Sequence, residues 1–203
     1  MPNASAGAAT LIDRLAATDA REREQAAREL FRLGCAAAEP VLRRWFADAE
    51  FRKLLPTGNV LLTVGIAVEP AHFEAIWRGS GKPHRAEVPP DQDAAEFSLS
   101  FAHGVRLDVL TTCEPGGAGA IARFLQRFGP GIQQVECDVR DVTRATAILR
   151  TGFSTEPVYP ETRSGADGAR VNFFLVPVEE SRKVLIELVE VPARQDQPKG
   201  KKR

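Results

Sequence analysis

The stretch FGPGIQQVECDVRDVTRATAILRTGF, from Phe128 to Phe153, changes its hydrophobic period in the middle. The segment Ile132–Val139 is predicted to be a strand, and polar and apolar residues alternate in it from Gln134 to Val139, which gives it two different faces. From Val142 to Leu149 apolar residues recur every three or four positions, which predicts a helix. Strand patterns follow at Val171–Val176 and Val184–Val191. The stretch therefore begins a unit in which a strand and a helix precede further strands.

An earlier part of the chain repeats this order. LTVGIAVEP (62–70) aligns with QQVECDVRD (133–141), and LDVL (107–110) aligns with IELV (186–189). The first copy is predicted to contain a strand at Val60–Val68, a helix at Ala71–Trp77, and a hairpin of Glu96–Ala102 and Val105–Thr112 that turns at His103-Gly104. A further short strand is expected in each copy, near Ala86–Val88 and near Phe153–Val158. The sequence thus predicts an α+β fold of two βαβββ modules.

A helical segment precedes the repeat, from Ala8 to Leu55. Asp19 and Glu22 form a capping-box pattern for its second helix, and Gly34 is expected to end that helix. The segment from Leu11 to Phe46 resembles one HEAT-type repeat. Because a single repeat cannot bury its own apolar face, we expect it to pack on the rest of the chain or on a partner. Covering a sheet face is favoured over recruiting a partner protein.

Composition excludes several classes of function. The 203 residues carry 27 basic and 27 acidic side chains, so there is no overall charge for binding nucleic acid or an anionic membrane. Three widely spaced cysteines show no zinc-ligand spacing and favour a reduced, cytoplasmic protein. We expect no secretion signal and no membrane span. The expected organisation is a helical segment (1–56), a paired-module domain (59–192) and a disordered basic tail (193–203).

The second module resembles that of a methylmalonyl-CoA epimerase, through FGPGIQQVECDVRDVTRATAILRTGF, ARVNFFLVP and KVLIELVEVP. NVLLTVGIAV resembles the first strand of the same family. More broadly, the chain is similar to the vicinal oxygen chelate superfamily of glyoxalase I, extradiol dioxygenases and bleomycin-resistance proteins. This resemblance implies that the two modules pair into a cupped, barrel-like mixed sheet. It also implies a cavity in which a divalent metal is chelated by adjacent oxygens of the substrate.

The resemblance places the metal-ligand positions on residues that break the family pattern. Thr63 and Gln134 stand where the epimerases carry histidines, whereas the glutamate of the last strand is retained as Glu187. The fourth position falls on Asp108 by the internal repeat, with Thr111 as a competing register. A set without imidazole or thiolate disfavours zinc, cobalt and nickel. We therefore expect no cofactor, and leave open a hard divalent cation such as Mg²⁺, Mn²⁺ or Ca²⁺.

Strand alternation makes the expected cup acidic. Glu136 and Asp138 follow Gln134 at the same two-residue spacing, so they share its face. Crowded carboxyl groups raise one another's pKa, which suits Glu187 and Asp108 to general acid and base roles. Thr63, Gln134, Glu136 and Asp138 are the candidate ligand-binding residues. The alternative is that Glu136 and Asp138 are solvated or pair with one of three arginines, Arg106, Arg140 or Arg170.

Three functions remain open, and with them whether the protein is an enzyme. The first is binding of a small molecule in the cup without a transition metal. The second is an epimerase-like lyase or isomerase that acts on a carbonyl compound through Glu187 and Asp108 with a hard divalent cation. The third is a protein-interaction module built on the N-terminal helices. An acidic cup disfavours phosphate-rich coenzyme A esters, and a homodimer is an open alternative.

Overall fold

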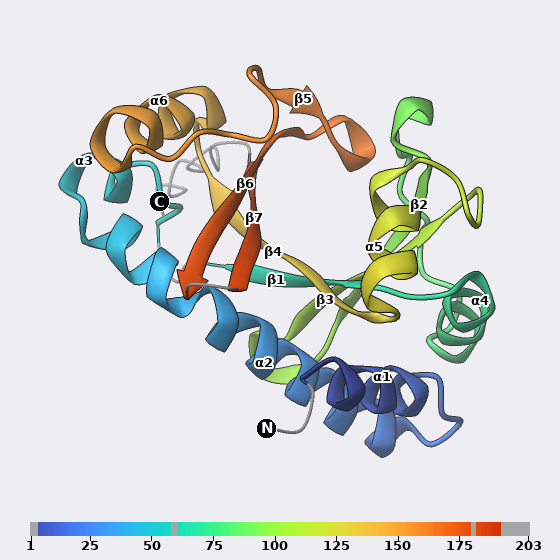
Figure 1. Ribbon diagram of the computed structural model, residues 1–203. Helices are drawn as coiled ribbons and strands as arrows, with labels where there is room; N and C mark the ends of the chain where they lie inside the picture. The colour runs from blue at the N-terminus through green and yellow to red at the C-terminus, as the bar shows by residue number, and fades with distance from the viewer. Residues whose placement is uncertain (1–3, 58–60, 180–181, 192–203) are drawn as a thin grey trace, which may run out of the picture.

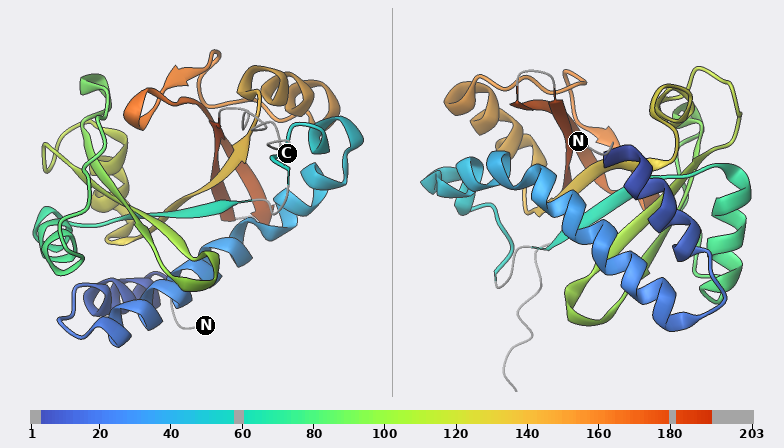
Figure 2. Two further views of the ribbon diagram at one scale, coloured as in Figure 1. Left: turned by 180° about the vertical axis from the view of Figure 1, so that it is seen from behind. Right: turned by 60° about the horizontal axis from the view of Figure 1, so that its bottom comes forward.

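The computed structural model describes residues 4–57, 61–179 and 182–191. Three helices, α1 (Ala4–Leu15), α2 (Ala20–Ala47) and α3 (Ala49–Arg52), precede a seven-stranded mixed sheet. The sheet curls into a half-barrel with one concave face, and α2 runs along the outside of the curl (Figures 1 and 2). The predicted α+β class with a helical N-terminal segment is confirmed. The expected tail from Ala193 onward lies outside the described residues.

Helix α2 runs straight through Gly34, so the predicted stop at this glycine is wrong. A Cβ atom built on Gly34 would lie 2.6 Å from both methyl groups of Val64 in the first strand. The glycine therefore allows the helix to approach the sheet closely. Asp19 caps the helix as predicted, since its side chain accepts hydrogen bonds from the backbone N–H groups of Arg21 and Glu22 at 2.7 and 3.0 Å.

The HEAT-type resemblance is not confirmed, because the two helices expected on either side of Gly34 are one helix of 28 residues. Its apolar side packs on the outer face of the sheet, where Trp45 meets Phe174 edge to face at a centroid distance of 5.8 Å. This burial agrees with the expectation that the segment covers a sheet face.

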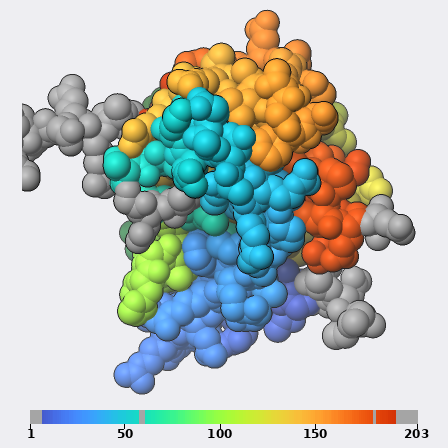
Figure 3. Space-filling model, turned by 90° about the vertical axis from the view of Figure 1, so that its left-hand side faces the viewer, coloured from blue at the N-terminus to red at the C-terminus, as the bar shows by residue number. Residues whose placement is uncertain are grey.

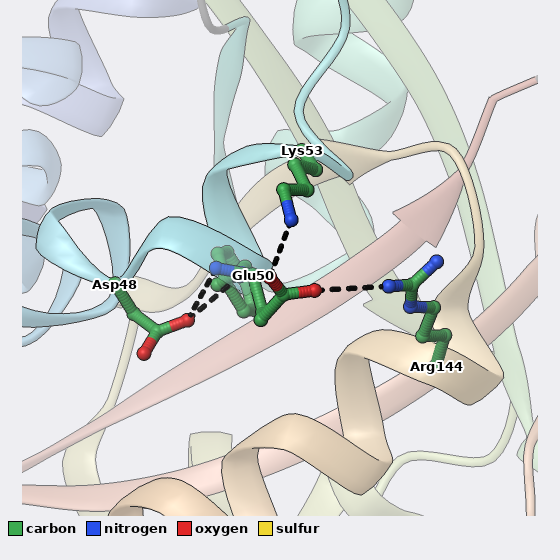
Figure 4. Close-up of polar contacts among 5 residues, drawn as sticks. Asp48, Glu50, Lys53 and Arg144 are labelled. Atoms are coloured by element: carbon green, nitrogen blue, oxygen red, sulfur yellow. Dashed lines mark hydrogen bonds and ion pairs between the residues drawn. The ribbon is translucent and has the colours of Figure 1, made fainter.

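Helix α3 joins the N-terminal segment to the second module. Arg144 of helix α6 (Val142–Phe153) forms an ion pair with Glu50 at 3.1 Å, and Lys53 also contacts Glu50 (Figure 4). Asp48 caps α3 by accepting hydrogen bonds from the backbone N–H groups of Glu50 and Phe51. Figure 3 shows the two helices side by side on this face of the molecule.

The sheet confirms the internal duplication. Its strands are β1 (Leu62–Ala67), β2 (Ala94–Ser100), β3 (Arg106–Thr112), β4 (Gly131–Val139), β5 (Arg163–Ser164), β6 (Arg170–Glu179) and β7 (Arg182–Glu190). Their order is β2-β3-β1-β4-β7-β6-β5. The first strands of the two modules, β1 and β4, pair antiparallel at the centre, and each pairs in parallel with the last strand of its own module. The predicted hairpin is also confirmed, and His103 adopts a φ of 60° in its turn.

The two additional short strands are not where the sequence predicted them. Residues 86–88 form no strand, although the Ala86 N–H donates to the Glu96 carbonyl at 2.9 Å. In the second module α6 extends to Phe153, and the extra strand is β5. Prolines at positions 83, 89, 90, 157 and 160 lie in or beside these segments. Since proline lacks the N–H group that a strand ladder needs, these stretches stay irregular.

The helices cover both faces of the sheet. Helix α4 (Pro70–Gly79) packs on the outer face, where Phe73 meets Phe97 at a centroid distance of 4.8 Å. Helix α5 (Ala120–Phe128) links the modules and covers one end of the concave face, where Ile121 and Leu125 pack with Ala67 and Leu110 in a core of their own. No helix in the described part of the chain is long and apolar enough to cross a membrane.

Contacts between the modules connect the two outer edges of the sheet. The Glu87 N–H donates to Asp167 Oδ1 at 2.9 Å, and the Asp167 N–H donates to the Glu87 carbonyl at 3.0 Å. Gln92 donates to the Ser164 carbonyl at 2.7 Å, and Arg163 pairs with Asp91. We call these four contacts the rim contacts. They join the loop before β2 to the region of β5, so they partly close the half-barrel over its concave face.

Candidate functional site

The concave face carries the polar residues that the sequence pattern assigned to a cup. Thr63 lies opposite Glu136, which lies opposite Glu187 on β7. Gly65 lies opposite both Asp108 and Gln134. Since residues paired directly across a ladder share a face, all five side chains belong to one surface. Their exposed fractions are only 2–9%.

The register resolves the choice between Asp108 and Thr111. Asp108 pairs with Gly65 and shares the concave face, whereas Thr111 is three residues further along β3 and therefore on the opposite face. The Thr111 hydroxyl donates to the Val68 carbonyl at 2.8 Å, which is a structural contact. Of the two residues, only Asp108 therefore lies on the concave face.

Gln134 lies among the carboxyl groups. Its Nε2 donates to Glu136 Oε1 at 3.1 Å and to Glu187 Oε2 at 2.5 Å. The side chain occupies space that Gly65 leaves free, because a Cβ atom on Gly65 would be 2.6 Å from Gln134 Cγ. The glycine and the glutamine are therefore a matched pair, and the glutamine fills the position of the expected histidine.

Sequence reasoning missed Glu96 on β2. This residue lies two positions before Ser98, which pairs with Asp108, so it shares the concave face. The signal was present in EFSLS (96–100), where polar residues alternate with the buried Phe97 and Leu99. We call Glu96, Asp108, Glu136 and Glu187 the carboxyl cluster, and the concave face that bears it the cup.

Burial makes the three glutamates of the carboxyl cluster reluctant to ionise. Desolvation raises the pKa of Glu136 well above its ordinary value, and the nearby charges of Asp108 and Glu187 raise it further. Desolvation and the charges of Glu96 and Asp108 likewise raise the pKa of Glu187, against a smaller lowering by Gln134. Burial, with Asp108 and Asp167 nearby, raises the pKa of Glu96 to about 8. Glu96 therefore holds its proton at neutral pH, and burial favours the protonated form of Glu136 and Glu187 as well.

Asp138 lies on the same strand as Glu136 but in a different environment. Arg106 Nη1 approaches Asp138 Oδ2 at 3.5 Å, which is one of the pairings considered from sequence. Burial raises the pKa of Asp138, and Arg106 opposes that effect. Because a cation already faces it, Asp138 stands apart from the carboxyl cluster.

Two buried oxygens in the cup have no hydrogen-bond partner. They are Thr63 Oγ1 and Asp108 Oδ1. Thr63 is 2% exposed and Asp108 is 5% exposed. Buried polar atoms are nearly always paired, and leaving one unpaired costs about 1–3 kcal/mol. The cup therefore has unused hydrogen-bonding capacity at its most buried positions.

The residues at the metal positions do not fit the metal that the fold family implies. Gln134 turns its amide nitrogen toward Glu136 and Glu187, which leaves only its neutral carbonyl oxygen as a possible ligand. Neutral oxygens do not suit the zinc, cobalt or nickel that imidazole binds. The three histidines lie elsewhere: His72 contacts Asp13, His84 contacts Asp167, and His103 is in the hairpin turn. Across residues 4–57, 61–179 and 182–191, no three His, Cys, Asp or Glu side chains are arranged to hold a metal ion.

Comparison with known proteins gives a consistent result. No protein-family model and no curated protein matches the chain. Among solved structures, it is similar to the methylmalonyl-CoA epimerase from Mycobacterium tuberculosis, with 32% identity, a TM-score of 0.54, and coverage of 70% of this chain and 95% of that one.

Two further structures share the fold. A variant of the Streptomyces coelicolor methylmalonyl-CoA epimerase, in complex with 2-nitronate-propionyl-CoA, has 24% identity and a TM-score of 0.53, with coverage of 69% of this chain and 96% of that one. A hypothetical protein from Bacillus halodurans C-125 has 24% identity and a TM-score of 0.52, with coverage of 66% and 94%. The duplicated curled sheet and the identity to the mycobacterial enzyme lead to one conclusion: the chain belongs to the vicinal oxygen chelate superfamily, with methylmalonyl-CoA epimerases among its structural relatives.

Proposed function

We propose that the cup binds a small polar organic ligand without a transition metal. The observation that carries this proposal is the pair of unpartnered oxygens, Thr63 Oγ1 and Asp108 Oδ1, on a concave face that already holds Gln134. A ligand with hydrogen-bond donors would satisfy both atoms, and in a buried site such contacts contribute more than they do in water. The family's two histidine positions hold Thr63 and Gln134, which favour hydrogen bonding over coordination of zinc, cobalt or nickel.

The test is a ligand screen with a reporter inside the cup. The side-chain amide of Gln134 in ¹⁵N-labelled full-length protein reports on contacts to Glu136 and Glu187. We expect a ligand to shift this signal equally with and without a metal chelator, and Thr63→Val to weaken binding. Glu24→Gln, on α2 and paired with Arg28 away from the cup, is the control. A ligand that binds only after addition of zinc or cobalt would contradict the proposal.

A second candidate is proton transfer at a carbon next to a carbonyl group, as in an epimerase-like isomerase or lyase. It is favoured by the 32% identity to an epimerase. Glu187 and Asp108 would act as acid and base: the ionised carboxylate removes the carbon-bound proton, and the protonated carboxyl returns a proton to the same carbon. The high pKa values of Glu136 and Glu187 also reduce the charge of the cup, and with it the repulsion of acyl-CoA esters that the count of acidic residues suggests.

The second candidate has a direct assay. Methylmalonyl-CoA is incubated with the protein in D₂O, and deuterium at the carbon next to the carbonyl is followed by mass spectrometry, with and without Mg²⁺. We expect exchange that is lost in Glu187→Gln and retained in Glu24→Gln, a surface carboxylate paired with Arg28 on α2. No exchange above the rate without protein would rule out this activity for that substrate and leave the binding proposal in place.

A further inference from the structure

We propose that the ligand of the cup is an organic cation, an amine whose ammonium group sits among the carboxyl cluster and whose apolar part lies along β6. This inference rests on the proposed binding function and adds the chemical class of the ligand. Two observations support it. The carboxyl cluster has no ion-pair partner in the described part of the chain, and two buried oxygens lack hydrogen bonds: Asp108 Oδ1 within the cluster and Thr63 Oγ1 on the same face.

The charge balance of the cup is one-sided. Four carboxyl groups from β2, β3, β4 and β7 share the face, and the ion pairs among the described residues include none of them. The cation on β3, Arg106, faces Asp138 instead. Acidic side chains are rarely buried unless they are paired. A ligand with positive charge would provide the partner that the fold itself does not.

The hydrogen-bond balance points the same way. Gln134 Nε2 is the donor that serves Glu136 and Glu187, while Thr63 Oγ1 and Asp108 Oδ1 have no partner. When its carboxyl groups are ionised, the cup is thus rich in acceptors and poor in donors. An ammonium group has three donors and no acceptor, so it complements this set. A carboxylate or phosphate ligand would bring more acceptors and more negative charge.

The distance between ligand atoms and the bound cation distinguishes an ammonium group from a metal ion. Mg²⁺ requires oxygens at about 2.0–2.1 Å and Ca²⁺ at about 2.3–2.6 Å, so several side chains must converge closely. The described residues contain no such arrangement of three His, Cys, Asp or Glu side chains. Charge-assisted N–H···O bonds span about 2.7–2.9 Å, so an ammonium group can bridge carboxyl groups that are more widely spaced.

An apolar wall continues from the carboxyl cluster. Phe173 lies directly opposite Glu187 on β6, and Leu175, two residues further on the same face, is 50% exposed. Tyr159 packs edge to face against Phe173 at a centroid distance of 6.0 Å. The Arg163 guanidinium already lies over the Tyr159 ring, at 4.3 Å from its centroid, so this wall contributes apolar contact to the ligand. A ligand such as an arylalkyl amine can therefore contact the carboxyl groups and this wall together.

The test compares three probes of the same shape with different charge. Benzylammonium, benzyl alcohol and benzoate are titrated into the full-length protein near neutral pH, and binding is followed by calorimetry and by the Gln134 side-chain amide signal. We expect benzylammonium to bind at least about tenfold more tightly than benzyl alcohol, and benzoate to be the weakest. Asp108→Asn and Glu187→Gln should each weaken benzylammonium binding, whereas Glu24→Gln should not. Circular dichroism confirms that each variant is folded.

Proton release is a second readout that needs no variant. Because burial raises the pKa of Glu96 to about 8, a cation bound beside it should displace its proton, and the affinity should increase as the pH rises toward 8. Asp108, Asp138, Arg106 and Asp167 are the other charged groups around the cup, and Arg106 is the cation among them. Calorimetry in buffers of different ionisation enthalpy measures the protons released.

The outcomes separate the two proposals. Tighter binding of benzyl alcohol or benzoate would overturn the cation inference and retain the binding function. A response of the Gln134 signal to Mg²⁺ or Ca²⁺ at lower concentration than to benzylammonium would also overturn it, in favour of a metal. Failure of every probe to perturb the cup would refute both.

Discussion

Replacement of Gly65 by alanine tests whether the cup depends on the pairing of this glycine with Gln134. The added Cβ would lie 2.6 Å from Gln134 Cγ and 3.1 Å from Leu110 Cδ1, and the first distance is shorter than real Cβ contacts. Overpacking of this kind costs about 1–3 kcal/mol. Replacing a strand glycine with alanine recovers about 0.5–1 kcal/mol of backbone entropy. The steric term is larger, so we expect a net loss of about 1–2 kcal/mol.

The assay is thermal unfolding of four proteins: wild type, Gly65→Ala, Gln134→Ala and the double variant. For a chain of this length, a loss of 1–2 kcal/mol lowers the Tm by roughly 2–8 °C. In the Gln134→Ala background the nearest contact of the new methyl group is gone, so the penalty of Gly65→Ala should fall by about 1 kcal/mol or more. The single variant should also shift the signals of Glu136 and Glu187, because Gln134 can no longer donate to both. Equal penalties in the two backgrounds would refute the reasoning.

Four further predictions concern the fold and its electrostatics. Gly34→Ala should destabilise the protein through its contact with Val64, and should become neutral or stabilising in a Val64→Ala background, as measured by urea unfolding. Because the folded pKa of Glu96 is about 8 against an ordinary value of 4.5, stability should fall as pH rises across that interval, and Glu96→Gln should flatten the dependence; an unchanged slope would contradict this assignment. Asp167→Ala removes a rim contact and should increase amide hydrogen exchange at residues 86–92 while leaving α2 unchanged. Removal of residues 1–56 uncovers the outer face of the sheet, so the remainder should lose soluble, cooperatively folding behaviour; a stable remainder would show that the helices are dispensable.

Local patterns predicted the elements of this fold well, since alternation and helical spacing depend on near neighbours. The strand from Ile132 to Val139 and the hairpin around His103 are present within a residue or two of the predicted bounds. Errors arose where a distant contact decided the outcome. Gly34 has the chemistry of a helix end, yet packing against Val64 makes it an interior position.

In the candidate site, too, local patterns predicted the residues, and distant contacts decided how they pair. The resemblance singled out Thr63, Gln134 and Glu187, the internal repeat added Asp108, and strand alternation added Glu136. Ladder pairing brings all five to one face. Glu96 was missed because the alternation of its strand was not extended to the cup, although the polar positions of EFSLS carry that signal. Pairing of Asp138 with Arg106 was one alternative among several before the strands were placed.

The amino-acid sequence alone determined the duplicated modules and the polar face of the central strands, because each is a property of residue type and period. Only the tertiary structure decided which oxygens are left without partners, which carboxyl groups meet and which cation is already used. These depend on the curl of the sheet and on the rim contacts between residues about 80 positions apart, such as Glu87 and Asp167. Burial then changes the protonation of side chains whose pKa values would be ordinary in an extended chain.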